Sequence, residues 1–159
     1  MAKIKILFVC LGNICRSPLA AVAMQDYVKQ HKLPYQFEVD SAGTSAYHVG
    51  SYSDPRSIKV ALNHGFRLKH KARQLIDQDL EYYDYILVMD HRNYEDVCNK
   101  FSQASTLDHV FLLRSFDPLA ENNYNVPDPF YGLESDFEEL FAMLQRSVAG
   151  FINFLSAQV

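Results

Sequence analysis

Cys10, Arg16 and Ser17 lie close together near the start of the 159-residue chain, in the segment Cys10-Leu11-Gly12-Asn13-Ile14-Cys15-Arg16-Ser17. A short loop of this kind can aim successive backbone N–H groups at a tetrahedral oxyanion. The planar guanidinium of Arg16 matches two phosphate oxygens. Cys10 would then lie in an electropositive cup that favours the nucleophilic thiolate, to which Ser17 could donate a hydrogen bond. The pattern predicts a cysteine that attacks a phosphate ester.

The residues on either side of this loop indicate what holds it. Residues 4–9 form a short apolar run, typical of a buried strand in a parallel sheet. Pro18 suits the first turn of a helix that continues to about residue 32. The loop is therefore expected at the carboxyl end of a strand and at a helix N-terminus. Ligands bind at the first of these places in open α/β sheets, and anions are attracted to the second.

Strand-like and helix-like segments alternate along the rest of the chain. Further strands are predicted at 36–40, 85–89 and 109–113, and further helices at about 55–64, 77–80, 91–101 and 137–155. A turn is predicted at residues 41–45, within or beside a long loop at 43–54, and a capping box at residues 135–138 is predicted to begin the last helix. The alternation predicts a single-domain α/β fold over residues 1–159, an open four-stranded parallel sheet with helices on both faces.

Composition narrows the classes of partner and compartment. The net charge of −4 argues against nucleic-acid and anionic-membrane partners. Apolar runs fall short of the roughly 20 residues that span a bilayer, and the N-terminus does not resemble a secretory signal peptide. Three cysteines suggest no disulfide framework. We therefore expect a cytoplasmic protein without membrane insertion, and we leave non-classical export open. We also expect a monomer or weak dimer, although the composition does not determine the oligomeric state.

The stretch Leu7-Phe8-Val9-Cys10-Leu11-Gly12-Asn13-Ile14-Cys15-Arg16-Ser17-Pro18 resembles the phosphate loop of the low-molecular-weight protein tyrosine phosphatases. The chain length and a later Asp128-Pro129 also match, so the resemblance covers essentially the whole chain. It implies strand order 2-1-3-4 and hydrolysis of protein phosphotyrosine and small aryl phosphates without metal or cofactor. It also implies that the phosphate is bound by Leu11, Gly12, Asn13, Ile14, Cys15 and Arg16.

Three catalytic roles are predicted. Cys10 attacks phosphorus to form a cysteinyl-phosphate, and Arg16 clamps the phosphate and stabilises charge in the transition state. The leaving oxygen then needs a proton, and the same group can later activate water. Asp128 is weakly indicated by sequence, because Asp-Pro is a common turn, but the resemblance implies that it is this acid and base. Asp117-Pro118 is the rival pair, which we interpret as an ordinary turn.

Residues outside the loop are expected to support it. The resemblance implies that Asn13, Ser41 and His70 hold the loop in shape through Ser17. Asparagine tolerates the left-handed backbone conformation that a tight loop can require. The alternative for His70 is an exposed position in a basic patch with Lys69, Lys71 and Arg73.

Aromatic residues are predicted to form a slot above the loop. Tyr47, Phe130 and Tyr131 are interpreted as walls that accept a phosphoaryl ring by stacking, with Asp54 at the rim. A deep slot favours phosphotyrosine, because the shorter phosphoserine cannot bring its phosphorus to Cys10. The alternative is a set of scattered surface aromatics. Phe130 replaces the tyrosine common in eukaryotic members, so regulatory phosphorylation is possible only at Tyr131.

The remaining cysteines and histidines suggest other possibilities. The resemblance implies a reversible Cys10–Cys15 disulfide that protects the nucleophile from overoxidation, whereas Cys98 is expected to pack on a helix. No metal site is predicted, because the histidines lack the spacing of zinc ligands. An arsenate reductase on the same fold would need two more cysteines near residues 80–90, where Tyr82 and Tyr83 lie instead. A cysteine phosphocarrier for sugar transport would need neither Arg16 nor Asp128.

Overall fold

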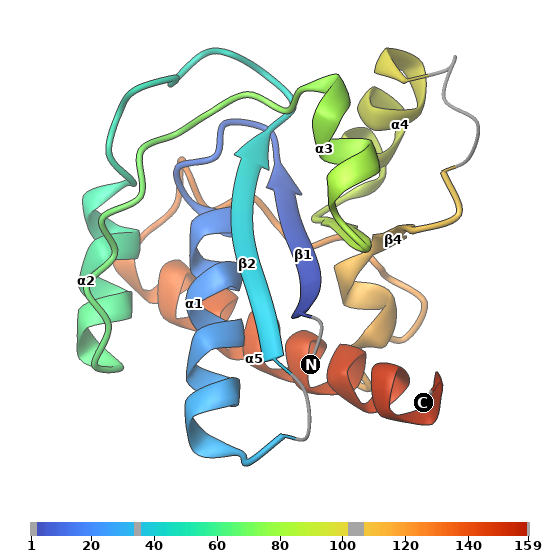
Figure 1. Cartoon of the computed structure of the whole chain (residues 1–159). Helices are drawn as coiled ribbons and strands as arrows, with labels where there is room; N and C mark the ends of the chain where they lie inside the picture. The colour runs from blue at the N-terminus through green and yellow to red at the C-terminus, as the bar shows by residue number, and fades with distance from the viewer. Residues whose placement is uncertain (1–2, 34–35, 102–106, 159) are drawn as a thin grey trace.

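The computed structural model describes residues 3–33, 36–101 and 107–158 (Figure 1). Their strands form one parallel sheet in the order β2-β1-β3-β4, which confirms the predicted order. The strands are β1 (Lys3–Cys10), β2 (Gln36–Gly43), β3 (Tyr85–Val88) and β4 (Val110–Leu112). Cys10 is thus the last residue of a central strand, and the phosphate loop follows it directly.

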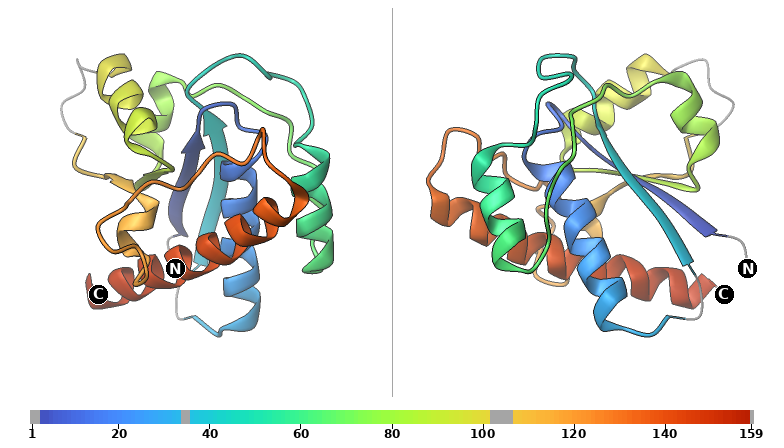
Figure 2. Two further views of the ribbon diagram at one scale, coloured as in Figure 1. Left: turned by 180° about the vertical axis from the view of Figure 1, so that it is seen from behind. Right: turned by 60° about the vertical axis from the view of Figure 1, so that its left-hand side comes forward.

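Helices cover both faces of the sheet. They are α1 (Arg16–Gln30), α2 (Pro55–Asn63), α3 (Asp77–Tyr82), α4 (His91–Lys100) and α5 (Glu134–Gln158), with a short 3-10 helix, η1 (Leu113–Phe116). Side chains of β1 alternate between the faces, as strand geometry requires. Ile6 and Phe8 pack in the core formed with α1, α2 and α5, whereas Leu7 and Val9 pack in the core formed with α3 and α4. Figure 2 (left) shows α5 crossing the face that is turned away in Figure 1.

Strand β2 is longer than predicted, and the expected turn at residues 41–45 is wrong for its first three positions. Residues 41–43 continue the parallel pairing with residues 8–10 of β1. Their small size made them look like a turn, but pairing with a central strand overrides local preference. Gly43 is required here, because a Cβ atom would lie 2.8 Å from the carbonyl oxygen of Leu11. The extension brings Ser41 up to the phosphate loop.

Two helix starts also differ from prediction. Helix α1 begins at Arg16, two residues before the expected Pro18, and Cys15 is its N-cap without a side-chain capping bond. Helix α5 begins at Glu134, so the predicted capping box at Ser135 is wrong. Asp136, the third helical residue, instead accepts a hydrogen bond from the backbone N–H of Leu133 at 2.7 Å. The charged N3 side chain therefore fixes this helix start.

Helix α5 is 25 residues long and is the one described helix that is long and apolar enough to cross a membrane by length and composition. Its apolar side is buried in this fold, where it packs on α1, α2 and η1. A core helix passes the same test of length and composition. We therefore interpret α5 as the core helix that the apolar periodicity predicted.

Candidate active site

The phosphate loop lies where β1 ends and α1 begins, and it forms the base of a cavity of about 210 Å³. The cavity is lined by Cys10, Leu11, Gly12, Asn13, Ile14, Cys15, Arg16, Tyr47, His48, Asp128, Phe130 and Tyr131. All of the predicted phosphate-binding residues therefore face one cavity, together with the predicted acid and the aromatic walls. The first-turn N–H groups of α1 and the partial positive charge of its N-terminus suit an anion here.

The sulfur of Cys10 is held by two polar groups. The backbone N–H of Asn13 donates to it at 3.2 Å, and the hydroxyl oxygen of Ser17 lies 3.0 Å away. Asn13 can aim its N–H inward because its backbone is left-handed, with φ of 60°. Asparagine adopts this conformation more readily than most residues. Both groups can donate a hydrogen bond to an anionic sulfur.

Asn13 is also the centre of the network that supports the loop. Its Nδ2 donates to the hydroxyl oxygens of Ser17 (2.8 Å) and Ser41 (3.0 Å). Its Oδ1 accepts from the backbone N–H of Arg73 (3.0 Å) and lies 2.7 Å from Nε2 of His70. Because Ser17 already accepts from the amide, its own hydrogen is free to point at Cys10. The predicted supporting residues are therefore brought together around one amide.

His70 is half-buried in this network rather than exposed in a basic patch. Burial lowers the pKa of His70 below its ordinary value of 6.5, although Asp40 on its other side opposes this shift. A neutral ring with its proton on Nε2 can donate to Asn13. Ser41 Oγ lies 3.2 Å from the same nitrogen, so it can share that proton.

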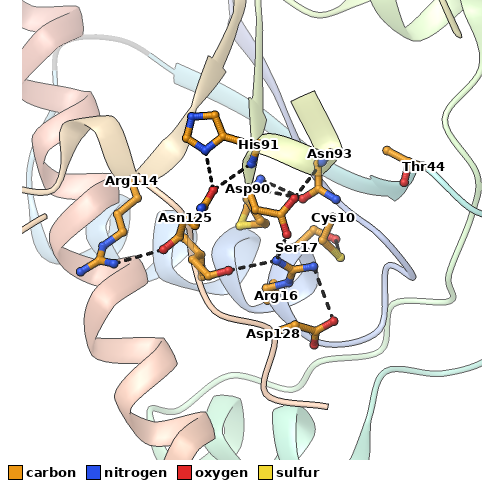
Figure 3. Close-up of polar contacts among 12 residues, drawn as sticks. Cys10, Arg16, Ser17, Thr44, Asp90, His91, Asn93, Arg114, Asn125 and Asp128 are labelled. Atoms are coloured by element: carbon orange, nitrogen blue, oxygen red, sulfur yellow. Dashed lines mark hydrogen bonds and ion pairs between the residues drawn. The ribbon is translucent and has the colours of Figure 1, made fainter. Parts of the chain in front are cut away.

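Arg16 is 3% exposed and is fixed from several sides (Figure 3). Its Nη1 donates to Asp90 Oδ2 at 2.7 Å and to the carbonyl oxygen of Val126 at 3.0 Å, while its Nη2 lies 3.6 Å from Asp128 Oδ2. Burial opposes its charge, but the nearby Cys10 and Asp90 outweigh burial and raise the pKa of Arg16. The guanidinium therefore stays charged beside the cavity.

Asp90 is a site residue that the sequence analysis missed. It caps α4, where its Oδ1 accepts from the backbone N–H of Asn93 at 2.8 Å. Its other oxygen holds Arg16, which lies 74 residues earlier. The available indication was its place two residues after the end of β3: because β3 neighbours β1, their carboxyl ends meet at one edge of the sheet.

Asp128 lies at the mouth of the cavity, with its side chain 45% exposed. Its Oδ1 accepts from the backbone N–H of Phe130 at 3.1 Å. The rival Asp117 has a fully buried carboxylate, which is paired with Arg146 at 3.0 Å and Arg114 at 3.4 Å. It also accepts from the backbone N–H of Leu119, so it does shape a turn. Only Asp128 of this pair faces the cavity.

The segment that leads to Asp128 is tied to the body of the protein. The N–H of Val126 donates to the carbonyl oxygen of Met89 at 2.7 Å. The side chain of Asn125 accepts from the backbone N–H of His91 at 2.8 Å, and its carbonyl oxygen accepts from Arg114 at 3.1 Å (Figure 3). These bonds fix the approach to Asp128 from the amino-terminal side.

Aromatic walls stand above the loop as predicted, with one addition and one correction. Tyr47 and Tyr131 are largely exposed. The addition is His48, a wall residue that was not predicted from the sequence, whose ring centroid lies 6.0 Å from that of Phe130. The correction is Asp54, which was predicted at the rim of the slot but does not line the cavity. It is 8% exposed, and its carboxylate caps α2 and pairs with Arg56.

The three cysteines are free thiols in different surroundings. Cys15 is buried in the phosphate loop, and burial together with the nearby Asp54 raises the pKa of its thiol well above the ordinary value. Cys98 is half-buried on α4, far along the chain from the loop. Across the described ranges, no three His, Cys, Asp or Glu side chains gather into a group that could hold a metal ion.

Comparison with known proteins agrees with this fold. Residues 5–159 match the family described as low molecular weight phosphotyrosine protein phosphatase. The human protein of that name is 38% identical over 149 residues, covering 93% of each chain. The protein tyrosine phosphatase of Entamoeba histolytica, solved with Hepes in its active site, has a TM-score of 0.87 at 33% identity, covering 98% of this chain and 99% of its own.

A further solved relative carries a different activity in its name. The drosophila arginine phosphatase has a TM-score of 0.88 at 27% identity and covers 96% of this chain and 98% of its own. The fold and the cysteine-arginine cup thus define a phosphatase class. The chain belongs to the low molecular weight phosphotyrosine protein phosphatase family, whose members are metal-independent hydrolases.

Proposed function

We propose that the protein hydrolyses phosphotyrosine in proteins through a cysteinyl-phosphate intermediate. In the first step the Cys10 thiolate attacks phosphorus, and the S–P bond forms as the bond to the phenolic oxygen breaks. Asp128 gives its proton to that oxygen, so tyrosine leaves as a neutral phenol. Arg16 and the loop N–H groups bind the remaining phosphate oxygens, where charge is concentrated during transfer.

The second step returns the enzyme to its starting state. Asp128, now a carboxylate, takes a proton from a water molecule as that water attacks phosphorus. The S–P bond breaks, inorganic phosphate forms, and Cys10 leaves as a thiolate that Ser17 and the Asn13 N–H stabilise. One aspartate can serve both steps because it stands at the mouth of the cavity, where the phenol leaves and water enters.

The observation that carries this proposal is the arrangement around the sulfur. Cys10 has two donors within 3.2 Å and lies in the same cavity as Arg16 and Asp128. A small buried hydrophobe would need none of these groups. A phosphocarrier would need to keep its cysteinyl-phosphate, and the presence of Asp128 in the same cavity supports hydrolysis instead, because a carboxylate there can activate water. An arsenate reductase would need a cysteine relay, and Cys98 alone cannot supply one.

The cavity walls support an aryl phosphate over a phosphorylated guanidinium. Ile14, Tyr47, Phe130 and Tyr131 offer apolar and aromatic surface, which suits a flat neutral ring. Among the described residues that line the cavity, Asp128 is the only acidic one, so a cationic guanidinium would find no second carboxylate. The likeness to an arginine phosphatase still makes phosphoarginine the most informative competing substrate.

The test is hydrolysis of p-nitrophenyl phosphate by the reduced protein in the presence of EDTA, with and without vanadate. We expect turnover that EDTA leaves unchanged and vanadate inhibits. Cys10→Ser should abolish turnover and keep the fold, whereas Cys98→Ser serves as the matched control and should retain it. A phosphotyrosine peptide should be cleaved well and phosphoarginine poorly. Normal burst kinetics in Cys10→Ser, or preference for phosphoarginine, would contradict the proposal.

We also propose that oxidation regulates this site in a reducing, cytoplasmic setting. The free state of all three cysteines and the need for a reduced nucleophile support that setting. Cys15 lies in the same loop as Cys10 and is the nearest thiol in sequence that could form a disulfide with it. Such a bond would keep an oxidised Cys10 from proceeding to the irreversible sulfinic acid.

A further inference from the structure

Arg56 does not line the cavity, but its side chain forms hydrogen bonds with the segment that follows Asp128, the proposed general acid. It is the second residue of α2, which lies beside the start of α5 in both views of Figure 2. Its Nη2 donates to the carbonyl oxygen of Phe130 at 2.7 Å, and its Nη1 donates to that of Gly132 at 2.9 Å. One guanidinium therefore spans the turn after Pro129.

Arg56 is itself firmly placed. Its Nε and Nη2 donate to the two carboxylate oxygens of Asp54, at 3.0 Å and 2.9 Å. Asp54 is 8% exposed and is anchored as the N-cap of α2. The guanidinium also lies over the ring of Phe137, 4.4 Å from its centroid, in the first turn of α5. Asp54 is the N-cap of α2 and Phe137 lies on α5, so Arg56, whose side chain is 27% exposed, is held at the junction of these two packed helices.

The segment that carries Asp128 is thus fastened at both ends. On the amino-terminal side, Arg16 and Arg114 donate to the carbonyl oxygens of Val126 and Asn125. On the carboxyl-terminal side, Arg56 donates to those of Phe130 and Gly132. Asp128 lies between these two anchors, and its own carboxylate accepts from the N–H of Phe130. Any shift of Phe130 therefore changes where the acid points.

We propose that Arg56 is a positioning residue for the reaction: through Phe130 and Gly132 it holds Asp128 and the Phe130 wall in place. This inference rests on the proposed function, because it concerns the geometry of proton donation by Asp128. The alternative is that Arg56 only stabilises the junction of α2 and α5. The two differ in one respect, since a purely structural residue would not make the loss of rate depend on the leaving group.

The variant that tests this is Arg56→Lys. Lysine keeps the positive charge beside Asp54, but its single nitrogen cannot reproduce a fork that bonds one carboxylate and two carbonyl oxygens. We expect kcat/KM for phenyl phosphate to fall about tenfold more than kcat/KM for p-nitrophenyl phosphate, because phenoxide needs the proton of a well-placed acid more than p-nitrophenoxide does. Equal losses for both substrates would overturn the proposal.

Lys59→Gln is the matched control. Lys59 lies on the same helix and pairs with Glu134 at 3.1 Å, at the same helix junction, but it makes no bond to residues 130–132. We expect this variant to hydrolyse both substrates at wild-type rates. A leaving-group effect as large as that of Arg56→Lys would show that the packing of α2 against α5 is responsible, and not the hydrogen bonds from Arg56 to Phe130 and Gly132.

A measurement that does not depend on catalysis tests the role of Arg56 separately from the proposed phosphatase activity. Amide hydrogen exchange over residues 128–133 should be faster in Arg56→Lys than in the wild type or Lys59→Gln, whereas inhibition or binding by inorganic phosphate at the intact cup should be unchanged. Unchanged exchange would overturn the inference even in an active enzyme. If Arg56→Lys does not fold, Asp54→Asn combined with Arg56→Gln removes the fork without leaving a buried carboxylate unpaired, and the same outcomes apply.

Discussion

Arg16 and Asp90 form a 2.7 Å hydrogen-bonded ion pair that joins the first turn of α1 to the N-cap of α4. The pair can form because β1 and β3 are neighbours and both helices start from the same edge of the sheet. It uses Nη1 and leaves Nη2 directed toward Asp128. The guanidinium is therefore oriented before any phosphate binds, and this orientation lowers the entropic cost of binding phosphate.

The first prediction concerns this ion pair. Asp90→Asn keeps one side-chain oxygen, which can still cap α4, but it turns an amide donor toward Arg16, so the charge-assisted bond to Arg16 is lost. A freed guanidinium would turn toward Asp128, which lies only 3.6 Å from it. We expect kcat/KM for p-nitrophenyl phosphate to fall by about tenfold to hundredfold, the equivalent of the roughly 1.5–3 kcal/mol of such a bond.

Asp90→Ala provides the comparison. It removes the cap as well, so the free energy of unfolding should fall by about a further 1 kcal/mol relative to Asp90→Asn in urea unfolding. The rates of the two variants should be similar, because neither retains the charge that orients Arg16. A rise in kcat/KM for Asp90→Asn would show that Asp90 competes with phosphate instead of positioning Arg16.

The second prediction is a pH dependence of stability. The pKa of His70 is lowered by burial, so the folded protein binds fewer protons than the unfolded chain once the pH falls to about the ordinary value of 6.5. Stability from the neutral ring is therefore complete above 6.5 and is lost as the pH falls through 6.5 toward the lower folded pKa. His70→Gln can still donate to Asn13 but does not titrate.

Urea unfolding of both proteins across this range measures the effect. The wild type should lose stability faster than His70→Gln as the medium is acidified from neutral pH. Carboxylates with lowered pKa values, such as Asp54 and Asp117, titrate in both proteins at more acidic pH, so they cancel in the difference. Parallel stability curves for the two proteins would show that the folded state accepts a proton on His70 without cost.

The loop and the fold were predictable where local patterns determine them. Cys10, Arg16 and Ser17 fall within eight residues, and the strand and helix beside them have their own periodicity. The strand order and Asp128 needed the family resemblance, because neither is a local property. Asp90 and Arg56 were missed for the same reason: the contacts that link them to the site, Asp90 with Arg16 and Arg56 with Phe130, each span 74 residues of sequence, and only the folded chain brings these groups together.

Three predictions were wrong because a local sequence feature was compatible with two different structures. Residues 41–43 are small enough for a turn, but pairing with β1 makes them strand. Ser135 and Asp136 could each fix a helix start, and the charged residue at N3 does so. Asp54 was expected at the rim of the slot, but its carboxylate forms an ion pair with Arg56, two residues later. In each case a contact that the sequence does not display decides the outcome.

The third prediction concerns oxidation. After treatment with hydrogen peroxide, wild-type activity should return on addition of a dithiol, whereas Cys15→Ser should stay largely inactive because its Cys10 proceeds to sulfinic acid. Burial raises the pKa of Cys15, so little of it is thiolate at neutral pH and the recoverable fraction should increase with pH. Cys98→Ser is the control and should recover like the wild type. Full recovery of Cys15→Ser would exclude the protective disulfide.

The last prediction tests the acid. Asp128→Asn keeps the size of the side chain and an oxygen that can accept from the N–H of Phe130, but it has no carboxylic proton to give. General acids contribute about 10²–10⁴-fold. We expect kcat/KM to fall by about a hundredfold or more for phenyl phosphate and by much less for p-nitrophenyl phosphate, because p-nitrophenoxide is stable enough to leave unprotonated.

The first half-reaction and the second can be separated in this variant. The quantity kcat/KM reports steps up to loss of the phenol, whereas kcat also includes hydrolysis of the cysteinyl-phosphate. Because Asp128 is proposed to activate water, Asp128→Asn should release a burst of p-nitrophenol equal to the enzyme present and then turn over slowly. The phosphorylated cysteine should be detectable by mass spectrometry during that slow phase. If both substrates slow equally and no burst appears, the proton donor is a group other than Asp128, and His48, the histidine that lines the same cavity, becomes the residue to replace next.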